Sequence, residues 1–232
     1  MKPESLKQVL ADRAAKRPVI LATELGSGAD RLIYRNQPTG EPLLDQACQR
    51  AFTDDRSGVV EIGGKKLFLN VFNPPLRLMV VGAVHIAQPL SRMAALTGYD
   101  VTIIDPRSAF ATDERFPGVT LSGAWPDEAL DGLKPDARSA VVTLTHDPKL
   151  DDPALDSALK SEAFYIGALG SKKTHAARLE RLRRLGHDEN SLARIRGPVG
   201  LRIGAKSQSE IAISIMGQII ETLRGSGEEA VA

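Results

Sequence analysis

Residues 78–87 read LMVVGAVHIA, and this stretch decides the fold. An apolar run of four residues leads directly into Gly82. A segment with helical character then follows from about His85 to Leu96. An apolar strand, a glycine turn and a helix in this order are typical of the first unit of a nucleotide-binding sheet.

The same alternation continues along the chain. Further strands are expected over 101–104, 140–145 and 164–169, and helices over 152–161, 172–185 and 208–223. Asp152-Pro153 is interpreted as an N-cap followed by proline at the first helical position. Ser207 and Glu210 have the spacing of a capping box. Continuous apolar strands alternating with helices predict an α/β fold, a Rossmann-like doubly wound parallel sheet covered on both faces.

The composition changes near Asn73-Pro74-Pro75, where we place a domain boundary. Before the boundary, helices are expected over 3–16 and 42–52, and strands over 19–23, 31–34, 59–62 and 66–72. The last two strands flank Gly63-Gly64, which predicts a hairpin. The predicted organisation is a small N-terminal α+β domain (1–75), a Rossmann-like domain (76–225) and a tail (226–232).

Composition excludes several classes of protein. The chain has 232 residues, with 30 Lys and Arg against 29 Asp and Glu, so its charge gives no argument for a nucleic-acid or anionic-membrane partner. No apolar run approaches the roughly 20 residues of a membrane span. A single cysteine, Cys48, implies no internal disulfide, and no histidine pair has metal-ligand spacing. Because residues 1–17 lack the apolar core of a signal peptide, we expect a soluble, cytoplasmic protein.

The turn after the first strand is the first candidate ligand site, because ligands of such sheets bind beyond the carboxyl ends of the strands. Gly82 and Ala87 match a dinucleotide fingerprint, but Val84 replaces its second glycine. The turn therefore either binds a ligand in altered form or has lost it, and the sequence leaves both open. Ala83 and His85 lie in the same turn. We expect Val84 to crowd a pyrophosphate, so that NAD(P) binds weakly or not at all.

Two later strands also end in polar residues. Asp105 follows the second strand about twenty residues after Gly82, where an acid would accept from ribose hydroxyls, and Arg107 could meet a phosphate. His146 and Asp147 end the third strand, as a proton shuttle or an oriented donor would. The alternatives are a capped turn at Asp105-Pro106 and an exposed strand end at His146.

The segment GALGSKK (167–173) is the best candidate for anion binding. It contains Gly167, Gly170, Ser171 and Lys172, and it runs from a strand into the start of a helix, where free N–H groups converge. The alternative is that Ser171 only caps this helix. A glycine-rich loop over 197–206 also suggests close backbone approach, either to the sheet or to a ligand.

Taken in order, these segments resemble the XdhC/CoxI family, the accessory proteins of xanthine dehydrogenase and carbon monoxide dehydrogenase. The resemblance covers 76–224 and rests on the blocks GAVH (82–85), VTIIDPR (101–107), FATDERFP (110–117), LTHD (144–147), YIGALGSKK (165–173) and PVGLRIGA (198–205). It implies a chaperone that binds molybdenum cofactor, as molybdopterin or its dinucleotide form, and assists its maturation and insertion. The implied ligand site comprises Gly82, His85, Asp105, Arg107, His146, Gly170 and Ser171. The expected partner is the large subunit of the apo-molybdoenzyme, while a cysteine desulfurase and a second copy of the chain stay open.

Two departures from the family pattern bear on mechanism. Many members have glycine where this chain has Val84, and the N-terminal region lacks the cysteine-containing motif of longer relatives. We therefore interpret Cys48 as a buried structural thiol. Two rival hypotheses remain: an NAD(P)-dependent oxidoreductase, for which His146 is the candidate proton-transfer residue, and a nucleotide-sensing module without chemistry. An accessory protein without catalytic turnover is the favoured interpretation.

Overall fold

The computed structural model describes residues 2–225, and the chain divides into two compact units, residues 1–74 and 75–232. The predicted tail (226–232) lies outside the described residues. Within the described residues no helix is long and apolar enough to cross a membrane.

The N-terminal unit is a four-stranded antiparallel sheet with two helices. Its elements are α1 (Pro3–Ala14), β1 (Val19–Glu24), β2 (Asp30–Tyr34), α2 (Pro42–Asp54), β3 (Gly58–Ile62) and β4 (Lys65–Phe72), with strand order β2-β1-β4-β3. The predicted hairpin is present, and both Gly63 and Gly64 have positive φ, as a two-residue hairpin turn requires. Leu44 and Phe52 of α2 are buried against Ile20 and Leu69 of the sheet.

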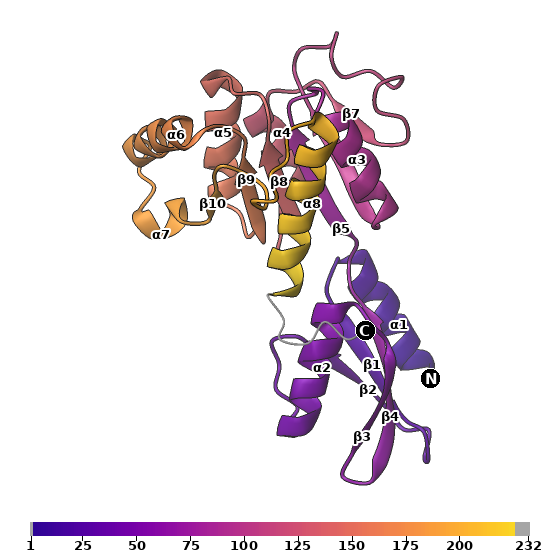
Figure 1. Cartoon of the computed structure of the whole chain (residues 1–232). Coiled ribbons are helices and arrows are strands. Elements are labelled where there is room, and N and C mark those ends of the chain that lie inside the picture. Colours follow the sequence, from indigo (N-terminus) through magenta and orange to yellow (C-terminus); the bar gives the residue numbers. More distant parts are fainter. Residues whose placement is uncertain (1, 226–232) are drawn as a thin grey trace. The chain divides into compact units, whose positions relative to one another are not determined.

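The C-terminal unit is built on a six-stranded parallel sheet (Figure 1). Its elements are β5 (Leu76–Val81), α3 (Ala87–Leu96), β6 (Tyr99–Ile104), β7 (Thr120–Ser122), α4 (Pro126–Leu133), β8 (Ser139–Thr143), α5 (Pro148–Leu159), β9 (Tyr165–Ala168), α6 (Lys172–Arg184), α7 (Glu189–Leu192), β10 (Ile195–Arg196) and α8 (Gln208–Arg224). The strand order β7-β6-β5-β8-β9-β10 is the Rossmann order 3-2-1-4-5-6. The predicted α/β class and Rossmann-like sheet are therefore confirmed.

Helices cover both faces of this sheet, and the side chains of β5 alternate between the two layers. Leu78 and Val80 belong to the core cluster that includes side chains of α3 and α8. Met79 and Val81 belong to the cluster that includes side chains of α4, α5 and α6. The strand is buried on both faces, which explains its uninterrupted apolar sequence.

One predicted helix start is wrong. Helix α5 begins at Pro148, and Asp147 is its N-cap, with a side chain that accepts a hydrogen bond from the Lys149 N–H at 2.9 Å. Pro153 therefore lies inside the helix, and Asp152 forms an ion pair with Arg181 of α6. Two Asp-Pro pairs lie five residues apart, and the sequence offers no way to choose between them except the position of the preceding strand.

Candidate functional site

The ends of β5 and β8 meet at the point where the strand order reverses. Gly82 has φ +108°, and a Cβ placed on it would lie 2.5 Å from Cγ2 of Thr145. No side chain fits in this space. Glycine is therefore required here by the neighbouring strand end, whatever the ligand. This close approach places Gly82 and the loop after β8 at one edge of the sheet.

Asp105 is fully buried at the same edge, and its carboxylate has four hydrogen-bond donors. Its Oδ2 accepts from the Ala83 N–H and from Arg107 Nη2, both at 2.8 Å. Its Oδ1 accepts from the N–H and Nε of Arg107, at 3.0 Å and 2.9 Å. A carboxylate offers about four acceptor positions, so all of them are used within the protein. Asp105 is thus a clamp between two loops, and its expected bonds to ribose hydroxyls stay a prediction that requires some of these contacts to open.

The charge state of Asp105 follows from these contacts. Burial acts to raise the pKa of the Asp105 carboxyl, but the hydrogen bonds from Arg107 and Ala83 outweigh it, and the pKa lies below the ordinary value. The Asp105 carboxylate in turn raises the pKa of Arg107, whose side chain is 41% exposed. The Arg107 guanidinium also lies over the Phe110 ring, 4.8 Å from its centroid. Arg107 therefore presents a held positive charge at the surface of this edge.

The loop after β8 holds His146 in an unusual backbone conformation, with φ +64°. Residues on both sides fix it. The Thr145 hydroxyl donates to Asp151 Oδ1 at 2.6 Å and accepts from the Asp147 N–H at 3.0 Å. The His146 side chain is exposed beyond this turn. Non-glycine residues that their neighbours hold in the left-handed region are enriched at functional sites.

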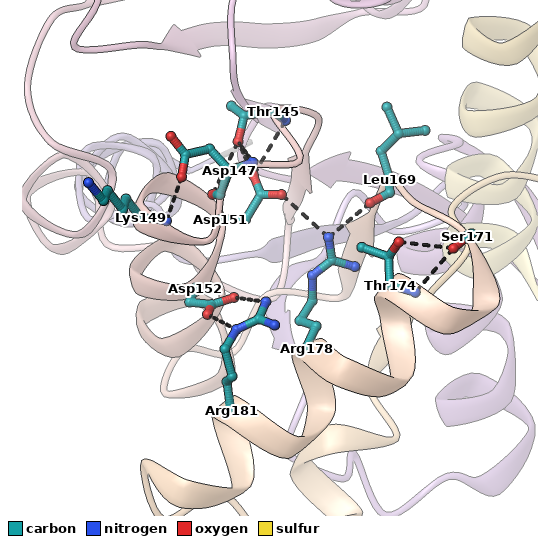
Figure 2. A network of polar contacts seen from close by, with 10 residues as sticks. All are labelled: Thr145, Asp147, Lys149, Asp151, Asp152, Leu169, Ser171, Thr174, Arg178 and Arg181. Carbon is teal, nitrogen blue, oxygen red and sulfur yellow. Dashed lines mark hydrogen bonds and ion pairs between the residues drawn. The ribbon is translucent and has the colours of Figure 1, made fainter.

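A buried ion pair connects this loop to the next one (Figure 2). Asp151 Oδ2 lies 3.4 Å from Arg178 Nη2, and both side chains are at most 2% exposed. The same Nη2 donates to the Leu169 carbonyl at 2.9 Å, whereas Nε and Nη1 of Arg178 have no partner among the described residues. Burial raises the pKa of Asp151 and lowers that of Arg178. The pair fixes the end of β9 relative to the start of α5.

The loop after β9 leads into α6 through Gly170 and Ser171. Gly170 has φ +144° and packs against Thr174, and Ser171 accepts a hydrogen bond from the Thr174 N–H at 3.1 Å. Ser171 is therefore the N-cap of α6, and the side chain of Lys172 is exposed beside it. A helix start of this kind favours anions. Gly167 differs, because a Cβ there would lie 2.6 Å from Val199 Cγ2, so its small size serves packing.

Two residues of the first turn lie apart from this network. His85 is exposed and lines a pocket of about 430 Å³ with residues of α3 and the start of α8. Val84 is partly buried and packs against the core cluster of α3 and α8. Its methyl groups therefore contribute to the core.

The structure thus brings most of the predicted site residues to one edge of the parallel sheet. Direct contacts connect Ala83, Asp105 and Arg107, and the buried pair of Asp151 and Arg178 connects the His146 loop to the Gly170 loop. Sequence reasoning did not identify Asp151 and Arg178. Arg178 lies in a helix rich in Lys and Arg, and nothing in that pattern distinguishes a buried arginine from solvated ones.

The chain offers no thiolate to a ligand. Cys48 is 3% exposed in the core of the N-terminal unit, and burial raises the pKa of its thiol to about 11. Among the described residues, no group of three or more His, Cys, Asp and Glu side chains could hold a metal ion. Cations, N–H groups and an exposed imidazole are among the groups that this edge presents to a ligand.

The sequence of this chain is similar to those of known proteins. The molybdenum cofactor insertion chaperone PaoD of Escherichia coli is 34% identical over 150 residues, which cover 64% of this chain and 40% of that protein. A Bacillus subtilis protein named as a probable xanthine dehydrogenase subunit is 32% identical over 157 residues, 67% of this chain and 46% of that one. The chain thus matches less than half the length of each of these relatives.

A crystal structure of a xanthine dehydrogenase from Bacillus halodurans has the same fold. The TM-score is 0.67 at 24% sequence identity, and the match covers 98% of this chain and 66% of that one. The family model described as the XdhC Rossmann domain matches residues 78–219, which contain all the loops of the sheet edge described above. The chain therefore belongs to the XdhC family.

Proposed function

We propose that this protein binds molybdenum cofactor and assists its insertion into a xanthine dehydrogenase-type or carbon monoxide dehydrogenase-type molybdoenzyme. The observation that carries this proposal is the match to a relative named as a molybdenum cofactor insertion chaperone. The family match covers residues 78–219, the domain that holds the sheet edge. The partner in this proposal is the large subunit of the apo-molybdoenzyme. The protein acts as a carrier and has no turnover of its own.

The donor groups of the sheet edge fit the phosphorylated end of such a cofactor. Gly170, Ser171 and Lys172 form a capped helix start with an exposed ammonium group, which suits a phosphate. Arg107 adds a second held cation. When bound, the cofactor supplies the molybdenum centre that the acceptor enzyme uses. Contacts between a phosphate and Lys, Arg or N–H groups are non-covalent. Because Cys48 is buried, no thiolate of this chain would hold the molybdenum, so release of the cofactor would need no bond cleavage.

His146 is the residue that we assign to retention or handover of the ligand. Its backbone is fixed by Thr145 and Asp147 while its imidazole faces solvent, so the ring is presented at a defined place. His146→Ala removes the ring but keeps the left-handed backbone under strain. His146→Gly removes the ring and relieves the strain. Both variants are expected to lose cofactor equally if the imidazole contacts it.

The experiment isolates wild type and both variants from cells that make molybdenum cofactor and measures bound molybdenum and pterin. We expect wild type to retain both and the two His146 variants to retain several-fold less. Full retention by both variants would show that the ring has no part in binding. NAD(P)-dependent hydride transfer by wild type, lost in His146→Ala, would instead support an oxidoreductase.

A further inference from the structure

A pocket lies beyond the end of β10, beside the start of α6. The segment 197–206 forms one side of an open pocket of about 670 Å³. The pocket is lined by this segment and by side chains from β10, α6 and α8. Its volume is in the range of small-molecule sites.

The charged side chains that line this pocket are cations. Lys172, Arg196 and Arg202 line it, and no Asp or Glu of the described residues does. None of the three cations forms an ion pair with another residue of 2–225, and all three side chains are exposed. The whole chain carries a formal net charge of only +1, so three unpaired cations around one pocket are a local concentration of charge. Such an arrangement favours a multiply charged anion.

The loop 197–206 is held in place by side chains of α6 and α8. The Gln218 side chain accepts from the Gly200 N–H at 2.9 Å and from the Tyr165 hydroxyl at 2.7 Å. A Cβ on Gly197 would lie 2.2 Å from His175, and one on Gly200 would lie 2.4 Å from Ser214. Of the three glycines in this loop, Gly197 and Gly200 therefore lie close to other parts of the protein itself. The loop backbone is held in place before any ligand arrives.

Gly204 is different from these two glycines. It lines the pocket, has φ +78°, and a Cβ there would meet nothing within 4 Å. No packing within residues 2–225 requires a small residue at this place. The positive φ sets the turn, and the open side leaves the backbone accessible from the pocket.

We propose that this pocket binds a phosphoryl group, as a phosphate monoester or a diphosphate, through Lys172, Arg196 and Arg202. The planar guanidinium groups match phosphate oxygens in pairs, and the ammonium group adds a point charge. This deepens the proposed function and rests on it, because it adds Arg196 and Arg202 to Lys172 as contacts of the phosphorylated end of the cofactor. Lys172 connects the two regions, since it also begins α6.

The test titrates inorganic pyrophosphate, and separately inorganic phosphate, into the full-length protein at fixed ionic strength with calorimetric detection. Lys172→Ala and Arg202→Ala each remove one lining cation and are expected to weaken pyrophosphate binding about tenfold. Lys173→Ala is the matched control. It removes the same charge from the next residue of α6, which is exposed but does not line the pocket. Its affinity should stay within about twofold of wild type.

Equal weakening by Lys173→Ala would overturn the proposal, because it would show general attraction to a basic helix start. No pyrophosphate binding by wild type would overturn it as well.

A second measurement, of the pterin that co-purifies with each variant, shows whether the phosphoryl group belongs to the cofactor or to a free phosphate compound. Loss of co-purifying pterin from Lys172→Ala and Arg202→Ala supports the cofactor as ligand. Unchanged pterin with lost pyrophosphate binding overturns that assignment and points to a free phosphate compound. Absence of pterin from wild type with intact pyrophosphate binding refutes the proposed function and leaves the pocket in place.

Discussion

At the scale of single residues, Asp105 shows how a position typical of ligand binding can be used within the protein. Its carboxylate bonds the Ala83 N–H of the turn after β5, and it holds Arg107 by three further contacts. The acid thereby fixes the shape of the first turn and the direction of the arginine. A ligand at this edge meets Arg107 first, because Asp105 is fully buried behind it.

Replacing Asp105 by asparagine tests this clamp. The amide keeps the shape of the side chain but loses the charge and turns an N–H₂ group toward existing donors. We expect a loss of about 1–3 kcal/mol in the free energy of unfolding at neutral pH, since one buried donor is left without an acceptor. Urea unfolding of the two proteins measures it. An unchanged free energy of unfolding would mean that the carboxylate contacts are not maintained in solution.

The difference in the free energy of unfolding between wild type and Asp105→Asn should depend on pH. The folded pKa of Asp105 is below its ordinary value of 3.8, so its stabilising effect is complete above that value and is lost as the pH falls through the folded pKa. The gap between wild type and Asp105→Asn should be constant from about pH 5 to 7 and should narrow below about pH 4. A gap that narrows between pH 5 and 7 would contradict a lowered pKa.

At the scale of elements, the junction of β5 and β8 sets the geometry of the site. Gly82→Ala adds a Cβ where Cγ2 of Thr145 already lies and forces a residue with a side chain into φ +108°. We expect this change to cost about 2–5 kcal/mol of stability. Thr145→Ser removes Cγ2 but keeps the hydroxyl that bonds Asp151.

The double variant separates the two causes. Thr145→Ser alone should change the stability by less than about 1 kcal/mol, and in the Gly82→Ala background it should restore the part of the loss that is due to the clash. The remainder measures backbone strain. Denaturant unfolding of the four proteins gives the coupling energy. Additive effects would show that the two strand ends do not touch as the structure has them.

Elements differed in how well the sequence predicted them, and the reasons are local. The strand 78–81 and the helix beginning after Ser207 were predicted because an apolar run and a capping box are complete within a few residues. Strand β7 and helix α4 were missed, since they have only three and eight residues and β7 follows a long irregular loop. The buried pair of Asp151 and Arg178 joins two helices, so no local pattern encodes it.

At the scale of the whole molecule, the two units differ in the groups that they offer to a ligand. The N-terminal unit (1–74) has helices that begin without side-chain caps, at Lys2 and Glu41, and its single thiol is in the core. The C-terminal unit contains the capped start of α6, the clamp of Asp105 and the pocket beyond β10. Every group that we assign to a phosphorylated ligand therefore belongs to the C-terminal unit.

This division predicts the behaviour of a truncated chain. A protein beginning at Leu76 keeps the whole six-stranded sheet and both of its core clusters, so it should fold. It should bind pyrophosphate within about threefold of the full chain, because no assigned contact is removed. Calorimetry of the truncated protein, with its fold verified by circular dichroism, is the measurement. If a well-folded truncated protein loses binding, residues 1–74 carry part of the site, and the assignment of ligand contacts to the Rossmann-like domain alone is wrong.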